Sequence, residues 1–162
     1  MAEAVIIADS GPLIALARIG QLDLLSQLSS KVIIPPEIWN EVTIRGSTLP
    51  GAREVRSISW IKTRAPNPLL VNPLNILVDL GEAEAIALGQ EISDCILLLD
   101  DSQARKVAKR LNLRIVGTIG LLLRAKRMGL IGEIRPCIER LQSSGIYIRQ
   151  GLIDAVLVEA DE

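Results

Sequence analysis

Short apolar runs alternate along the chain with longer segments that have the period of a helix. The runs have the length of strands and are bounded by polar, Gly or Pro residues, as buried strands commonly are. We predict strands at residues 5–8, 32–34, 95–99 and 114–116, with 60–63 as a further candidate. Because strands that alternate with helices favour a parallel sheet covered by helices, the expected fold class is α/β.

The helical segments carry their own start and stop signals. Ser10 and Pro12 offer an N-cap and a first-turn proline, and Gly20 ends that helix. A short helix is predicted at 36–44, followed by a loop with Gly and Pro at 46–51. Segment 66–73 holds three prolines and is predicted to be a surface connection rather than a linker between domains. Further helices are predicted at 81–91, 102–111, 118–128, 133–141 and 152–159.

Length and composition limit the possible chemistry. A chain of 162 residues with 49% hydrophobic residues and no Phe predicts one domain with a core of branched aliphatic side chains. His is absent, which excludes a Ser-His-Asp triad, an HExxH metal site and a His-ligated zinc. Cys95 and Cys137 lie in separate apolar stretches without a CxxC motif. We therefore predict buried free thiols in a reducing compartment.

The charge balance gives no overall attraction to nucleic acid or membranes. The formal net charge is -1, so any such attraction must be local. The first residues lack a basic region and their apolar run ends at Asp9, so no secretory signal is expected. No apolar stretch approaches the roughly 20 residues that cross a bilayer. We expect a cytoplasmic protein with no membrane partner.

Acidic residues follow the predicted strands. Asp9 comes directly after the first strand, and Asp100 and Asp101 follow the strand at 95–99. Parallel strands present their carboxyl ends at one edge of a sheet, where ligands commonly bind. Carboxylates held close together at that edge repel one another and need a cation between them.

Three further acids lie on predicted helices. Glu82 and Glu84 begin the helix before the strand at 95–99, and Glu41 shares a helical stripe with Ile38 and Ile44. Each acid also has a simpler explanation. Those at helix starts are typical caps, Asp9 could belong to a turn, and Glu41 could pair with a basic residue one turn away. The order of the acids along the chain, in a protein without His, favours a shared site.

Five separated blocks resemble the PIN-domain family, close to its VapC-like group of predicted nucleic-acid-binding proteins. The blocks are VIIADSGPLIALARIG, IIPPEIWNEV, LDLGEAEAIAL, LLLDDSQARKVAKRL and IVGTIGLLLRAKRMGLI. The resemblance implies a single PIN-like domain over residues 1–162, folded as a three-layer α/β/α sandwich with a central, mainly parallel sheet. It also implies an acidic cluster that binds Mg²⁺ or Mn²⁺ and cleaves RNA.

The family's acids are carried over position by position. Asp9 matches the acid after the first strand, Glu41 the acid on the next helix, and Asp100 or Asp101 the acid after the later strand. Glu82 and Glu84 compete for the remaining place: the block EAIAL favours Glu84, whereas the helical stripe 82, 85, 86 and 89 favours Glu82.

Metal-assisted hydrolysis suits these residue types. Mg²⁺ takes oxygen ligands, often one or two carboxylates together with water and a substrate phosphate. We expect Asp9 and one of the acids at 100 and 101 to be metal ligands, direct or through water. Glu41 and one of Glu82 and Glu84 would be further ligands or would orient water, and Ser10 is a candidate phosphate contact.

Positive charge is concentrated in one part of the chain. Residues 103–127 hold eight basic residues and no acid, so this stretch is expected to contact RNA phosphates; exposed helix faces with no such role are the alternative. Trp39, Trp60 and Tyr147 are expected in the core or an interface. The predicted nucleic-acid contacts in the basic stretch are Arg105, Lys106, Lys109, Arg110, Arg124, Lys126 and Arg127.

Three classes of function follow. The first is a metal-dependent endoribonuclease, as in the toxin of a toxin–antitoxin pair that a small antitoxin restrains. The second is a PIN-like protein that binds RNA or a partner without cleaving. The third, a receiver-type signalling domain, is disfavoured because the first strand ends in one acid and 114–117 lacks the required Lys. A homodimer through the apolar faces of 131–141 and 152–158 is also expected.

Overall fold

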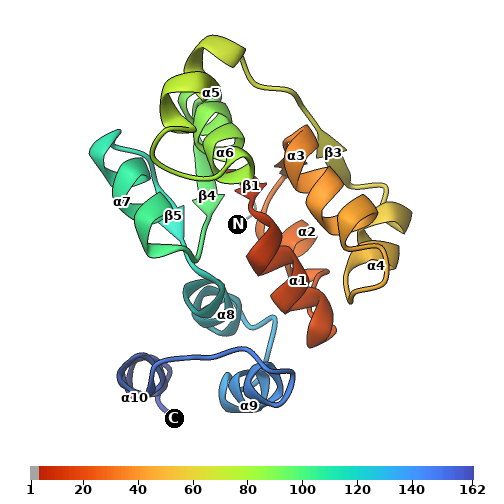
Figure 1. Ribbon diagram of the computed structural model, residues 1–162. Coiled ribbons are helices and arrows are strands. Elements are labelled where there is room, and N and C mark those ends of the chain that lie inside the picture. Colours follow the sequence, from red (N-terminus) through yellow and green to blue (C-terminus); the bar gives the residue numbers. More distant parts are fainter. Residues whose placement is uncertain (1–3) are drawn as a thin grey trace.

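The computed structural model describes residues 4–162 and shows a five-stranded, all-parallel sheet (Figure 1). Residues 1–3 lie outside the described residues. They belong to the expected 1–162 domain and to the segment in which no secretory signal is expected. The strand order is β3-β2-β1-β4-β5, which the sequence pattern did not predict. The strands are β1 (Val5–Ala8), β2 (Lys31–Ile34), β3 (Ile61–Thr63), β4 (Cys95–Leu98) and β5 (Ile115–Val116).

Helices connect the strands and cover both faces of the sheet. Ala8 pairs with Leu98 at the ends of β1 and β4, so the residues that follow these strands leave the sheet side by side. The helices are α1 (Ser10–Arg18), α2 (Leu24–Leu28), α3 (Pro36–Trp39), the π-helix η1 (Asn40–Arg45), α4 (Ala52–Ser57), α5 (Pro68–Leu74), α6 (Leu80–Glu91), α7 (Ser102–Arg110), α8 (Thr118–Arg127), α9 (Arg135–Ser143) and α10 (Gln150–Glu159).

Two apolar layers lie on opposite faces of the sheet. Ile6 and Leu98 point into a core with residues of α1, α2, α8, α9 and α10, whereas Ile7 and Leu97 point into a second core formed with α5, α6 and α7. Alternate residues of a strand face opposite sides, which explains this division. The prediction of a three-layer α/β/α sandwich is therefore confirmed, with a wholly parallel sheet.

The predicted loop at 46–51 is confirmed as a run of turns that ends where α4 begins. The proline-rich connection contains a helix, because α5 occupies most of segment 66–73. Asn67 begins α5 by accepting a hydrogen bond from the Leu69 N–H at 3.0 Å, and Pro68 stands in the first turn, where its missing N–H is not needed. Asn67 and Pro68 together are a helix start signal, so this surface connection holds a helix that was not predicted.

Both cysteines are buried and free, as predicted. The thiols lie in different layers: Cys95 belongs to the core of α5, α6 and α7, and Cys137 to the opposite core. Burial raises the pKa of each thiol above its usual value, so these groups are structural rather than reactive. Within residues 4–162, no helix is both long enough and apolar enough to cross a bilayer.

Candidate functional site

Asp9 lies at the carboxyl end of β1, between two strands. Its backbone N–H donates to the Leu98 carbonyl of β4 at 3.1 Å, and the residue is 7% exposed. Asp9 also precedes α1, but its side chain does not cap that helix. The carboxylate is therefore buried without the capping role that would explain an acid at a helix start.

Burial and neighbouring charges disfavour the ionised form of Asp9. Burial is the largest cause and raises the pKa from 3.8 to about 7, while the Ser10 backbone N–H opposes the rise. The carboxylates of Glu82, Asp79 and Glu41 raise it further. These three acids come from two different elements, η1 and the start of α6, and they meet around the end of β1.

Glu41 reaches the cluster from the π-helix η1. It is half-buried, and burial raises its pKa, while a hydrogen bond from the Ser10 side chain lowers it and Asp79 raises it. A Cβ placed on Gly81 would come within 2.6 Å of Glu41 Oε1 and 2.9 Å of Ile38 Cδ1. Glycine at 81 thus lets the Glu41 carboxylate lie against the first turn of α6.

Glu82 and Asp79 form a capping box at the start of α6. Asp79 Oδ1 accepts from the Glu82 N–H at 2.8 Å, and Glu82 Oε1 accepts from the Asp79 N–H at 3.2 Å. Burial raises the pKa of Glu82 to about 7, and the charges of Asp79 and Asp101 raise it as well. Asp79 was missed in the sequence analysis, although its spacing to Glu82 is that of a capping box.

Glu84 lies apart from this cluster. Its Oε1 accepts a hydrogen bond from the Glu37 N–H at 3.0 Å, which joins α6 to the start of α3. The stripe formed by Glu82, Ala85, Ile86 and Gly89 is buried. The structure therefore turns Glu82, and not Glu84, towards Asp9.

The two adjacent acids after β4 also differ. Asp100 accepts hydrogen bonds from the Thr118 N–H at 2.8 Å and the Thr118 hydroxyl at 2.6 Å, so both its oxygens hold the start of α8. Asp101 uses Oδ2 to cap α7 through the Ala104 N–H at 2.9 Å. Asp101, and not Asp100, is among the charges that raise the pKa of Glu82.

Five acids therefore gather at the carboxyl edge of the sheet. They are Asp9, Glu41, Asp79, Glu82 and Asp101. We call this set the acidic edge. Helices α1, α6, α7 and α8 all begin here, and the positive ends of their dipoles partly offset the repulsion. Asp9 and Glu82 make no ion pair within residues 4–162.

The donors of the acidic edge fit a hard divalent cation. All are carboxylate oxygens, which Mg²⁺ and Mn²⁺ prefer, and a cation would relieve the repulsion that raises the Asp9 and Glu82 pKa values. Within residues 4–162 no three Asp, Glu or Cys side chains are already arranged as an ion site. Holding an ion would thus require side chains to rotate towards one another.

The predicted nucleic-acid contacts lie in different surroundings. Arg105 lies beside the acidic edge, where its Nη1 donates to the Leu99 carbonyl at 2.9 Å. Lys106, Lys109 and Arg110 are exposed along α7, away from its start. On α8, Lys126 binds the Glu162 carboxylate at 2.9 Å, and Arg127 pairs with Glu159 at 2.7 Å. These two cations already have carboxylate partners.

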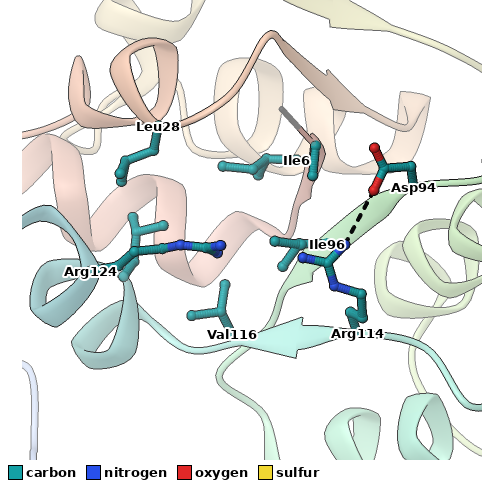
Figure 2. Close-up of a pocket in the computed structure, with 9 residues that line it drawn as sticks. Ile6, Leu28, Asp94, Ile96, Arg114, Val116 and Arg124 are labelled. Atoms are coloured by element: carbon teal, nitrogen blue, oxygen red, sulfur yellow. Dashed lines mark hydrogen bonds and ion pairs between the residues drawn. The ribbon is translucent and has the colours of Figure 1, made fainter. Parts of the chain in front are cut away.

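Arg124 belongs to the opposite edge of the sheet. It lines a cavity of about 90 Å³ with the Asp94–Arg114 ion pair, which precedes β4 and β5 (Figure 2). The close-up shows the Arg124 side chain reaching towards Ile6 and Ile96 on the sheet face. Arg124 is therefore distant from the start of α8, where Asp100 binds Thr118.

The apolar faces expected to form a homodimer are largely used within the chain. Ile138 and Leu141 of α9 and Ile153 and Val156 of α10 are buried in the core beside α8. These four side chains are not available to a second copy, whereas Leu152 and Val158 of α10 are exposed, so the homodimer stays a prediction. Trp39 and Trp60 pack against the same core as predicted. Tyr147 is 86% exposed, which excludes a core position and leaves its predicted place in an interface untested.

Comparison with known families agrees with the fold. The family model described as "DUF3368: PIN domain" matches residues 5–162. No curated protein sequence matches the chain. PIN domains are generally nucleases and typically use divalent metal ions. Because the match covers nearly the whole chain, this protein belongs to the PIN-domain family and has its nuclease-type fold.

Proposed function

We propose that this protein is a metal-dependent ribonuclease that hydrolyses phosphodiester bonds with Mg²⁺ or Mn²⁺. The observation that carries the proposal is the buried Asp9 carboxylate, which faces Glu41, Asp79 and Glu82 without a cation. A site that only stabilised the fold would gain nothing from this repulsion. A site that binds a divalent ion needs such a group of oxygens.

The acids of the acidic edge would have different roles, with some binding the metal ion and one accepting a proton. Asp9, Glu82 and Asp101 would hold the ion, because the charge of Glu82 acts on Asp9 and the charge of Asp101 acts on Glu82. When bound, Mg²⁺ or Mn²⁺ supplies an activated water and neutralises charge that develops on the phosphate. Glu41, whose pKa burial raises, is suited to accept a proton from an attacking water.

Other residues of the edge would orient the substrate. Asp100 positions the start of α8 through Thr118. Gly117 leaves room beside these groups, because a Cβ at position 117 would lie 3.0 Å from both Asp100 Oδ1 and Arg105 Nη1. Arg105 is placed to meet a phosphate near the acids. Ser10, next to Asp9, remains a candidate phosphate contact.

We further propose that this ribonuclease is the toxin of a toxin–antitoxin pair and is restrained by a small antitoxin. Three large apolar side chains close to Asp79 in the sequence are exposed: Ile76, Leu77 and Leu80, with Ile76 84% exposed. Such a patch is typical of a protein contact. A partner bound there would also cover the acidic edge and could block access of RNA to it.

Binding of RNA without cleavage is the second candidate. It is favoured by one observation, that no three acids within residues 4–162 form a ready-made ion site. This candidate predicts RNA binding with no product at any concentration of Mg²⁺ or Mn²⁺.

A cleavage assay separates the candidates. Single-stranded RNA is incubated with the protein in Mg²⁺ or Mn²⁺, and the products are resolved by length. We expect cleavage that chelation stops and that Asp9→Asn lowers by about 100-fold or more. The control is Asp94→Asn, which changes an exposed acid at the opposite edge of the sheet. Equal cleavage by the parent and Asp9→Asn would refute the proposal.

A further inference from the structure

A large hollow adjoins the acidic edge and is not explained by metal binding. Its volume is about 680 Å³, which is within the range of small-ligand sites. Asp100, Ser102 and Thr118 line one side, where α7 and α8 begin, and residues 146–149 between α9 and α10 line the other. Figure 1 shows the connection from α9 to α10 running below α8. We call this hollow the side pocket.

The segment that walls the side pocket presents alternate residues to solvent. Ile148 is buried and Ile146 half-buried, whereas Tyr147 is 86% exposed and Arg149 is also exposed. This alternation places Tyr147 and Arg149 on the same side of the segment. An aromatic ring and a guanidinium are thus exposed side by side beside the acids.

Tyr147 stands between two hollows. Besides the side pocket, it lines a second hollow of about 470 Å³, together with Gln142 and Gln150. An exposed tyrosine between open spaces can take a base against its ring, and such stacking does not depend on base identity. Exposing a large aromatic side chain in this way gives the fold itself no packing energy.

Arg149 supplies a positive charge that could bind the phosphate of the same nucleotide. Among the ion pairs of residues 4–162, none involves Arg149, so its guanidinium is available to a phosphate. The neighbouring side of the pocket carries the hydroxyl groups of Ser102 and Thr118. An aromatic surface with a cation beside it is the combination that binds single-stranded nucleic acid.

We infer that Tyr147 and Arg149 form a subsite for a nucleotide that flanks the bond to be cleaved. Tyr147 stacks on the base and Arg149 contacts a phosphate, while Asp100 and Thr118 join this subsite to the acidic edge. The inference rests on the proposed function, because it takes single-stranded RNA as the substrate. It assigns to Tyr147 a binding role that neither the core nor the metal site provides.

Binding measured without cleavage tests the subsite. Fluorescence anisotropy with a labelled single-stranded RNA in EDTA gives the dissociation constant of each variant. We expect Tyr147→Ala to weaken binding about tenfold and Tyr147→Phe, which keeps the ring, to stay within about twofold of the parent. Arg149→Ala should weaken binding and lower the salt dependence by about 0.7, the slope of one phosphate contact. The control Lys31→Ala changes an exposed cation where β2 begins, at the opposite edge.

A change in the RNA separates stacking from other roles of Tyr147. If the ring stacks on a base, abasic RNA should bind the parent and Tyr147→Ala with similar affinity. Because Tyr147 is exposed, loss of folding does not explain a change in affinity. Unchanged binding of normal RNA by Tyr147→Ala would overturn the inference. The same result is expected if the side pocket binds a protein segment instead of RNA.

The two proposals fail in different ways. Cleavage that depends on Asp9, combined with RNA binding that ignores Tyr147 and Arg149, would refute the subsite and leave the ribonuclease intact. RNA binding that depends on Tyr147, without cleavage in any divalent ion, would support the subsite and refute the ribonuclease. A parent protein that binds no RNA would refute both.

Discussion

Asp9 is a buried carboxylate surrounded by other carboxylates. Its pKa is about 7 instead of 3.8, first because of burial and then because of Glu82, Asp79 and Glu41. A shift of this size corresponds to a cost of about 4 kcal/mol when the group is ionised in the folded protein. The charge at Asp9 therefore works against folding unless a cation is bound.

Replacing this charge should stabilise the metal-free protein. We expect Asp9→Asn to raise the free energy of unfolding at pH 8 by up to about 4 kcal/mol in EDTA, as measured by urea denaturation. Asp94→Asn, at an exposed site, should change it by less than about 0.5 kcal/mol. A destabilised Asp9→Asn variant would mean that the carboxylate supports the fold.

The same carboxylates predict how stability depends on pH. Asp9 and Glu82 have folded-state pKa values raised to about 7, so the folded protein holds protons that the unfolded chain has released. The free energy of unfolding without divalent ions should therefore fall from about pH 4 to pH 7 and level off above. Denaturation midpoints across this range measure the fall, and Asp9→Asn should reduce it. An unchanged slope would contradict the assignment.

Helix α6 brings two acids to the edge and makes room for a third. Gly81 allows Glu41 to lie against its first turn. We expect Gly81→Ala to displace Glu41 and lower cleavage about tenfold, with little loss of stability because Ala favours a helix by about 1 kcal/mol over Gly. Cleavage rates and melting temperatures measure the two effects.

Gly89→Ala is the matched control for this prediction. It changes a glycine of the same helix, and its Cβ would approach Leu97 and Leu113 rather than an acid. Its cleavage rate should stay close to that of the parent. Equal losses in the two variants would show that α6 itself, and not the Glu41 position, determines activity.

Glu162 joins three elements through one carboxylate. It accepts hydrogen bonds from the N–H groups of Ile134 and Arg135 at 2.7 and 3.0 Å and pairs with Lys126 of α8. Burial opposes ionisation of Glu162, but these hydrogen bonds lower its pKa to about 2. This stabilisation is present above the ordinary pKa of 4.5 and is lost as the pH falls towards 2.

Loss of this carboxylate should weaken the attachment of α9 to α8. We expect Glu162→Gln to lower the free energy of unfolding at pH 7 by about 1 to 3 kcal/mol. Glu159→Gln removes the exposed pair with Arg127 and should cost less than about 1 kcal/mol. Urea denaturation compares the two, and equal effects would contradict the role given to Glu162.

Patterning predicts the strands better than the short helices. Each strand lies within one residue of its predicted bounds because a buried apolar run is a strong local signal. Helices α2, α4 and α5 have five to seven residues, too few for a clear helical period. The strand order depends on packing between distant segments, which a single sequence does not show.

Part of the site could be predicted because the strands could be located in the sequence. Asp9 and the pair at 100 and 101 follow strands, so their positions at one edge could be inferred from the sequence. The choice between neighbouring acids could not be inferred, because it depends on which backbone N–H groups lie nearby. The Thr118 N–H donates to Asp100, and the Glu37 N–H donates to Glu84. Asp79 was recognisable only as half of a capping box.

The whole molecule separates its charges. Acids gather at the carboxyl edge of the sheet, while basic residues follow α7 and α8 away from it. Lys126 and Arg127 are paired with acids near α10, whereas Lys106, Lys109 and Arg110 are exposed on α7. The α7 group is therefore open to RNA phosphates without breaking an ion pair within residues 4–162.

This separation predicts different responses to mutation. Alanine at each of Lys106, Lys109 and Arg110 should weaken RNA binding and lower its salt dependence by up to about one. Alanine at Lys126 or Arg127 should leave RNA binding unchanged. Binding measured against salt concentration distinguishes the two groups, and a loss confined to the α8 variants would contradict the proposed path of the RNA.

Anomalous diffraction from crystals soaked in Mn²⁺ at pH 8 would show whether the acidic edge binds a metal ion. We expect an anomalous peak between the carboxylates of Asp9, Glu82 and Asp101, at about 2.0–2.3 Å from the nearest oxygens. Density at saturating Mn²⁺ that is absent from the Asp9 carboxylate, or found only at other acids, would contradict this expectation.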